Sequence, residues 1–168
     1  MAQPILRSNL RTMGARLALL GVLMASASVS HAEPSARAGL AIQVNADRSE
    51  YDSRLGTHRL WGDVRIQHGS LVVLADEGTA FRAGEEDRIE LHGTPARWTM
   101  TLDDGSEADG ESQTLIYDLN TEVLTMIGQA QVSDHRGTLT GAQLSYSLVT
   151  ETMIGEGGVE FLIEPPQG

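Results

Sequence analysis

The side chains that could carry covalent or metal chemistry are few and scattered in this sequence. It contains no cysteine, and all twelve of its basic residues are arginine. This excludes thiolate nucleophiles, Cys-based zinc sites, Schiff-base lysines and phosphate-binding loops that require a lysine. The histidines at 58, 68, 92 and 135 lack the His-x-His or His-x₃-His spacing of a metal site. We therefore predict neither a metal centre nor a cofactor.

One acidic run is dense enough to consider as an ion site. Residues 103–111 (DDGSEADGE) hold five carboxylates, and carboxylate oxygens are the ligands that Ca²⁺ prefers. The order of these residues does not match an EF-hand loop, and an exposed hairpin tip explains the run better. Calcium binding by this cluster is left open.

The motifs of common hydrolases are missing from the sequence. It contains no Gly-x-Ser-x-Gly, no Ser-x-x-Lys and no zinc-binding His/Glu helix. We predict that the protein is not an enzyme. Because carboxylates are plentiful, a β-solenoid that acts on polysaccharide through a carboxylate pair remains the enzymatic alternative.

The balance of charge argues against a nucleic-acid partner. The 168 residues include 12 Arg and 23 Asp+Glu, a formal net charge of −11, and only 4% of them are aromatic. An acidic chain with few aromatic rings suits neither phosphate contacts nor base stacking. The length allows one domain, and 40% hydrophobic residues with 18 glycines indicate a folded chain with many turns.

Residues 1–32 predict a cleavable signal peptide. Arg7, Arg11 and Arg16 precede an apolar stretch at 17–25, and small residues at 30 and 32 suit signal peptidase. A retained membrane anchor is the alternative. After cleavage, 12 − 3 = 9 arginines remain against 23 acids, a net charge of −14. Residues 33–168 are then expected to form a single exported domain.

Two periodicities predict the elements of this domain. Polar and apolar residues alternate at 88–92, 96–102 and 129–132, which is typical of strands with one buried face. Ala-Asp pairs begin at 46, 75 and 108, and an apolar–Gly step recurs at Gly62, Gly93, Gly128 and Gly155. Repeats near thirty residues indicate a stack in which each unit packs on its neighbours.

The predicted fold is therefore all-β. Four repeats would give stacked antiparallel β-repeats of about sixteen short strands, in two facing sheets that bend at the recurring glycines. Such a stack is open at both ends and leaves strand edges unpaired there. Open ends favour head-to-tail association, or docking of similar partners by strand addition.

Six segments lie along the chain in a characteristic order and spacing: IQVNAD at 42–47, LWGDVRIQHGSL at 60–71, VLAD at 73–76, GTPA at 93–96, LIYDL at 115–119 and GAQLSY at 141–146. Together these segments resemble the OstA-like family of lipopolysaccharide transport. The resemblance runs from about Ile42 to Phe161. A cleavable signal and one short domain favour the soluble periplasmic bridge members over the membrane-anchored and outer-membrane members.

The resemblance implies a twisted β-jelly roll whose hydrophobic groove holds the acyl chains of lipopolysaccharide. It also implies a periplasmic location and a role in outer-membrane assembly. The protein would form homo-oligomers and, through end-to-end β-strand addition, bridge an inner-membrane lipopolysaccharide transporter complex and an outer-membrane translocon. A β-stack that serves as a scaffold without a ligand remains an alternative.

Alternation along the strands predicts which residues would line this groove. Trp98, Met100 and Met126 are the preferred lipid contacts, because large adaptable side chains suit a variable apolar ligand. Trp61 falls on the opposite parity and is expected outside the groove or at a corner. The full predicted lipid-binding set is Ile42, Val44, Leu60, Val64, Ile66, Leu71, Val73, Trp98, Met100, Tyr117, Leu119, Met126 and Val132.

Overall fold

The computed structural model describes residues 39–83 and 86–163. The predicted signal peptide therefore lies outside the described residues. The described part consists of antiparallel strands joined by turns, which confirms the all-β prediction. It contains no helix of the length and apolar character needed to cross a membrane.

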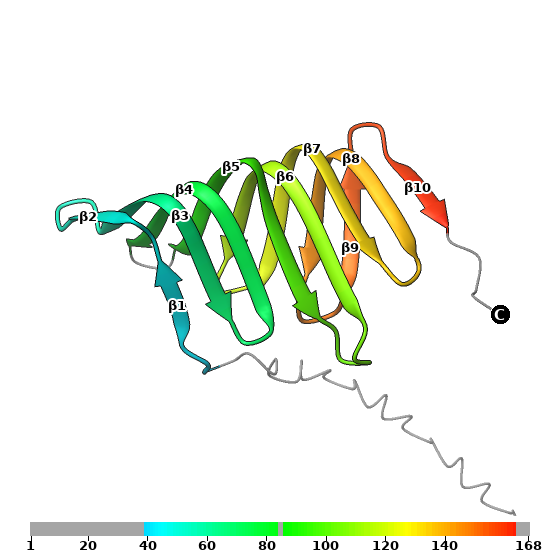
Figure 1. The fold of residues 1–168 in the computed structure, drawn as a ribbon, viewed down its shortest axis with the longest axis horizontal. Coiled ribbons are helices and arrows are strands. Elements are labelled where there is room, and N and C mark those ends of the chain that lie inside the picture. The colour runs from blue at the N-terminus through cyan, green and yellow to red at the C-terminus, as the bar shows by residue number, and fades with distance from the viewer. Residues whose placement is uncertain (1–38, 84–85, 164–168) are drawn as a thin grey trace, which may run out of the picture. The chain divides into compact units, whose positions relative to one another are not determined.

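Ten strands form one sheet (Figure 1). They are β1 (Ile42–Asn45), β2 (Arg48–Asp52), β3 (Thr57–His68), β4 (Leu71–Ala83), β5 (Glu86–Thr101), β6 (Glu107–Asp118), β7 (Val123–Asp134), β8 (Gly137–Ser147), β9 (Thr152–Glu156) and β10 (Glu160–Ile163). The sheet order is β1-β3-β4-β5-β6-β7-β8-β10, with β2 also paired to β3 and β9 also paired to β8.

A bend near the middle of every long strand divides the sheet into two arms. Pairing shifts register there, for example between Trp61 and Val64 in β3 and between Ile127 and Ala130 in β7. Arm A contains residues 42–45, 64–68, 71–75, 96–101, 107–111, 130–134, 137–141 and 160–163. Arm B contains residues 48–52, 57–61, 77–83, 86–92, 114–118, 123–127, 143–147 and 152–156.

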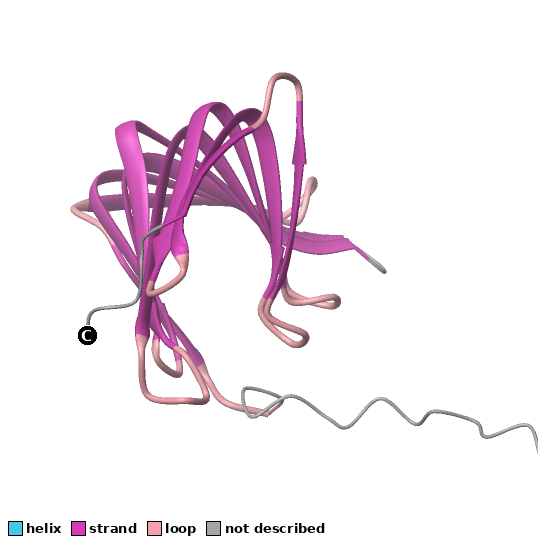
Figure 2. Cartoon of the chain, turned by 90° about the vertical axis from the view of Figure 1, so that its right-hand side faces the viewer, coloured by secondary structure: helices cyan, strands magenta, loops and turns pink. Residues whose placement is uncertain are grey.

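Each arm thus holds eight short segments, which accounts for the prediction of about sixteen strands. The structure has ten because β3 to β8 continue through the bend, so the expected two facing sheets are one sheet folded on itself. Figure 2 shows this fold end-on, with the two arms descending from a common curved side.

Three of the four predicted glycine bends are confirmed. Gly62 and Gly128 adopt positive φ of 75° and 82°, a conformation that side chains rarely tolerate. At Gly93 a Cβ atom would lie 2.6 Å from the backbone nitrogen of Ala96. The prediction of a bend at Gly155 is wrong, because Gly155 pairs regularly with Leu144 inside β9. The last bend falls instead at 157–158, between β9 and β10, where both glycines have positive φ.

The hydrophobic core lies between the arms and draws on both of them. One-sided alternation explains this, since alternate residues of each arm face the other arm. The buried apolar side chains are Leu60, Val64, Ile66, Leu71, Val73, Ile89, Leu91, Ala96, Trp98, Met100, Leu102, Ala108, Leu115, Tyr117, Leu124, Met126, Ala130, Val132, Leu144, Tyr146 and Leu148.

Candidate functional site: an apolar trough between two arms

The space between the arms, with the side chains that face it, is called the trough. Turns border its open side. The described turns at the free edge of arm A (rim A) are 69–70, 102–106 and 135–136. Those at the free edge of arm B (rim B) are 53–56, 119–122 and 148–151.

The thirteen predicted lining residues all carry side chains on or near this inward face. Ten of them are buried: Leu60, Val64, Ile66, Leu71, Val73, Trp98, Met100, Tyr117, Met126 and Val132. Ile42 and Leu119 are partly buried and pack against the core. Val44 is 42% exposed at the β1 edge. Their lipid-binding role remains a prediction.

The middle of the trough is filled by its own side chains. The Trp98 indole nitrogen on arm A donates a hydrogen bond to the Met126 sulfur on arm B at 3.2 Å. The Trp98 ring stacks on Tyr146 of arm B, with 5.5 Å between ring centroids. A Cβ at Gly110 would collide with the indole, so glycine makes room for it. Trp98 thus spans the trough and fills it at this level.

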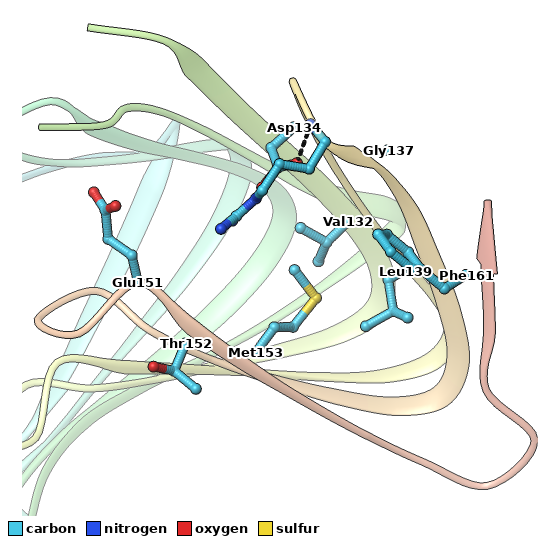
Figure 3. Close-up of a pocket in the computed structure, with 9 residues that line it drawn as sticks. Val132, Asp134, Gly137, Leu139, Glu151, Thr152, Met153 and Phe161 are labelled. Carbon is cyan, nitrogen blue, oxygen red and sulfur yellow. Dashed lines mark hydrogen bonds and ion pairs between the residues drawn. The ribbon is translucent and has the colours of Figure 1, made fainter. Parts of the chain in front are cut away.

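The C-terminal end of the trough is open. A cavity of about 430 Å³ lies there, within the range of small-ligand sites. Figure 3 shows the apolar side chains of Val132, Leu139, Met153 and Phe161 gathered in this region. Charged groups at 134, 136 and 151 border the cavity.

The N-terminal end has two further cavities, of about 380 and 470 Å³. Val44 and Ala80 line both of them, Ile42 and Leu119 line the first, and Leu60 lines the second. Predicted lining residues therefore contribute to openings at both ends of the trough.

Two of the charged residues at the border of the C-terminal cavity, Asp134 and Arg136, neutralise each other. Arg136 donates to Asp134 through Nε at 2.8 Å and also through a terminal nitrogen. Burial favours the neutral acid at Asp134, but hydrogen bonds from the Arg136 side chain and backbone outweigh it and hold the pKa of Asp134 below its ordinary value. Because Arg136 is engaged by its own neighbour, this end is a poor clamp for a phosphate.

The acidic run at 103–111 forms the β5–β6 turn and the first part of β6. Asp104 accepts hydrogen bonds from the backbone and hydroxyl of Ser106, as at a hairpin tip. Burial, followed by repulsion from Glu111 and Glu107, raises the pKa of Asp109. Among the described residues, no group of three or more His, Asp or Glu side chains is arranged to hold a metal ion.

Trp61 and His68 lie near the trough. Trp61, expected outside the groove or at a corner, lies at the bend, half-buried, with the Arg48 guanidinium 4.6 Å from its ring centroid. His68, for which the sequence suggests only a test as a metal ligand, is buried in the trough and shares a hydrogen bond with Tyr117. The alternation that placed Val64 and Ile66 inward also places His68 inward, so a signal for it was present.

The described residues thus define an open-ended antiparallel sheet, folded on itself around an apolar interior, and apolar concave surfaces of this kind are the type that hydrophobic ligands bind. Residues 43–152 match the family described as "LptA/(LptD N-terminal domain) LPS transport protein", and the chain belongs to this family. The resemblance to lipopolysaccharide-transport proteins is thereby confirmed.

Individual relatives agree with this assignment. The chain is 25% identical to the lipopolysaccharide export system protein LptA of Haemophilus influenzae over 120 residues, covering 69% of this chain and 70% of that protein. It is 22% identical to LptA of Escherichia coli K12 over 115 residues, which span 62% of the relative's length.

A solved structure shares the fold. LptH of Pseudomonas aeruginosa, described as the LptA-homologous periplasmic component of the lipopolysaccharide transport device, matches with a TM-score of 0.72 at 22% identity. The match covers 79% of this chain and all of that chain.

Proposed function

We propose that this protein is a periplasmic lipopolysaccharide carrier that shields acyl chains in its trough. The observation that carries the proposal is one apolar inward face, reaching from Val44 at one open end to Phe161 at the other. This face belongs to a chain of a lipopolysaccharide-transport family.

The hydrophobic effect explains why acyl chains need such a carrier. Burying a methylene is worth about 0.8 kcal/mol, so a twelve-carbon acyl chain in water costs about 10 kcal/mol. A lipid with several chains therefore needs cover to cross an aqueous compartment. Apolar side chains between two arms supply that cover without any catalytic group.

Charge favours a grip on the tails rather than the head. With nine arginines against 23 acids after signal cleavage, the protein repels phosphorylated head groups on average. The head groups would then remain in solvent along the open side. No enzymatic step is needed, and we assign no catalytic residue or cofactor.

The two ends support assembly. Among the described residues, β1 and β2 pair only with β3, while β9 and β10 pair only with β8, so each end presents a strand edge. Large apolar side chains are exposed beside these edges, including Val44 and Leu55 at one end and Leu162 and Ile163 at the other. Strand addition at these edges would join copies of the protein into an oligomer.

The same edges would connect the oligomer to an inner-membrane lipopolysaccharide transporter complex and an outer-membrane translocon. Such a bridge would carry lipopolysaccharide between the two membranes. The energy for transport must then come from a partner, since nothing in the trough suits a nucleotide.

A competition experiment tests the proposal. The exported protein is titrated with fluorescently labelled lipopolysaccharide, and either lipid A or the delipidated polysaccharide is added as competitor. We expect lipid A to displace the label and the polysaccharide to leave it bound. Displacement by polysaccharide alone would favour the polysaccharide-active alternative. Folded protein that binds no lipopolysaccharide would favour the ligand-free scaffold.

A further inference from the structure

Two directional polar contacts between described residues join the arms near the open side of the trough, in addition to the Trp98–Met126 hydrogen bond in its middle. The first joins β3 of arm A to β6 of arm B, where His68 Nδ1 and the Tyr117 hydroxyl lie 2.6 Å apart. The rings themselves are 6.0 Å apart between centroids. Both residues lie near the free ends of their arms, two residues or fewer from the turns at 69–70 and 119–122.

The second contact joins the two rims directly. The backbone N–H of Asp103, in the rim A turn at 102–106, donates to Glu151 Oε1 in the rim B turn at 148–151 at 3.2 Å. Glu151 also attracts Arg136 of rim A and contributes to raising the arginine's pKa, after the larger effect of Asp134. Beside this contact, Leu102 of rim A and Leu148 of rim B are both buried.

These contacts differ in kind from those that hold each arm together. Within an arm, neighbouring strands share backbone ladders. Between the described rims no strand pairing is present, so separating the rims breaks side-chain contacts but no ladder. The glycine-bearing bend on the opposite side joins the arms throughout.

The apolar contacts between the arms can be replaced by acyl chains, because the hydrophobic effect is not directional. The two polar contacts cannot be replaced in this way, because a hydrogen bond needs a partner at a fixed distance and angle. They therefore distinguish the ligand-free trough from a trough filled with lipid.

We propose that His68–Tyr117 and Asp103–Glu151 form a latch that holds the rims together without lipid and opens to admit acyl chains from the side. This inference rests on the proposed lipid-carrying function and assigns the control of access to that site. His68 and Tyr117 are positioning residues here, since they act on the ligand through the separation of the arms.

The test measures the separation of the rims directly. The chain has no native cysteine, so Ser70→Cys on rim A and Asn120→Cys on rim B can carry two unique spin labels. Pulsed dipolar spectroscopy then gives the distance between the rims with and without purified lipopolysaccharide. Tyr117→Phe removes the hydroxyl and keeps the buried ring.

The matched control is Tyr51→Phe, because Tyr51 is exposed and its ring stacks on His58 within arm B, 4.3 Å between centroids. Glu151→Ala breaks the second contact at the surface and provides an independent variant with little risk to the core. Thermal unfolding of each variant shows whether an effect on distance merely reflects lost stability.

We expect lipopolysaccharide to lengthen the distance between the rims in the wild-type protein. Without lipid, Tyr117→Phe and Glu151→Ala should each enlarge the wide population about fivefold, as expected for one lost hydrogen bond. Apparent affinity for lipopolysaccharide should rise by a similar factor, because a larger fraction is competent to bind. Tyr51→Phe should match the wild type in both measurements.

Two results would overturn the latch. One is an identical distance distribution and affinity for Tyr117→Phe, Glu151→Ala and Tyr51→Phe. The other is lipopolysaccharide binding to the wild type with no change in distance. If neither the wild type nor any variant binds lipopolysaccharide, the proposed function is refuted instead. The distances measured without lipid would still decide whether the two contacts hold the rims together.

Discussion

The middle and the ends of the trough present the same face of the same sheet, yet they are in opposite states. Trp98 in the middle is 1% exposed, while Phe161 at the C-terminal end is 52% exposed. Both side chains are large and apolar, and both face inward. Side chains in the middle pack against the opposite arm. At each end of the sheet, the last described strands have a neighbouring strand on one side only. The difference shows that the middle is packed as a core, while the ends leave large apolar side chains exposed. Under the proposed function, the middle would become a ligand surface only when the arms separate, and the ends would bind another molecule.

The largest expected effect is on the packed middle. Trp98→Ala should lower the free energy of unfolding by about 3–5 kcal/mol, because it removes a buried aromatic that contacts both arms. Denaturant unfolding measures the loss. Thr99→Ala, at the next position on the exposed outer face, should stay within about 0.5 kcal/mol. A loss below about 1 kcal/mol for Trp98→Ala would mean that the middle is not the stabilising core.

The next effect concerns the ends. Phe161→Asp should weaken self-association at least about tenfold, because it places a charge on an exposed apolar surface that a second copy would cover. Its stability should change by less than about 1 kcal/mol. Sedimentation equilibrium across a concentration series provides the measurement. The prediction fails if the wild-type protein stays monomeric at every concentration and binds neither the inner-membrane transporter complex nor the outer-membrane translocon. The exposed apolar ends would then have no binding role.

Acid titration sharpens the comparison at the C-terminal opening. The pKa of Asp134 lies below its ordinary value of 3.8, so its ionised form stabilises the fold above that pH. Asp134→Asn should therefore cost about 1 kcal/mol at neutral pH through the lost charged hydrogen bonds to Arg136. The gap between the two proteins should close as the pH falls through the lowered pKa of Asp134. A stability difference between the two proteins that persists unchanged in strong acid would show that it does not come from the charged hydrogen bonds between Asp134 and Arg136.

The smallest effect is expected on the outer face behind the packed middle. Burial, then Glu111 and Glu107, raise the pKa of Asp109, so its ionised form is unfavourable in the folded protein. Asp109→Asn should raise stability by only a few tenths of a kcal/mol at neutral pH, since the carboxyl is only partly desolvated and the residue as a whole is exposed, so that solvent screens it. The gain should vanish at low pH, where wild-type Asp109 is protonated. A melting temperature lowered at neutral pH would contradict the prediction.

The sequence predicted much of this architecture because alternation and glycine spacing are local properties. Alternation placed Trp98 and Met126 on the inward face, and the recurring Gly62, Gly93 and Gly128 marked the bend. The last bend was missed because Gly155 repeats the spacing, while the adjacent positive-φ glycines at 157–158 make the turn.

Whether side chains fill the trough could not be predicted from the sequence, because the filling depends on the distance between the arms. Alternation shows that Trp98 points inward but not that its indole reaches Met126 and Tyr146 across the trough. The same holds for His68 and Tyr117, which are 49 positions apart in the sequence and come into contact only when the sheet folds on itself.

The central claim is that acyl chains of lipopolysaccharide enter the space between the arms. The most direct test places a photo-activatable aromatic residue at Trp98 in the exported protein, with the same residue at Thr99 as the outward control. Illumination in the presence of lipopolysaccharide should crosslink the lipid at position 98 and not at position 99. A crosslink at neither position in folded protein, or equal crosslinking at both, would contradict the account.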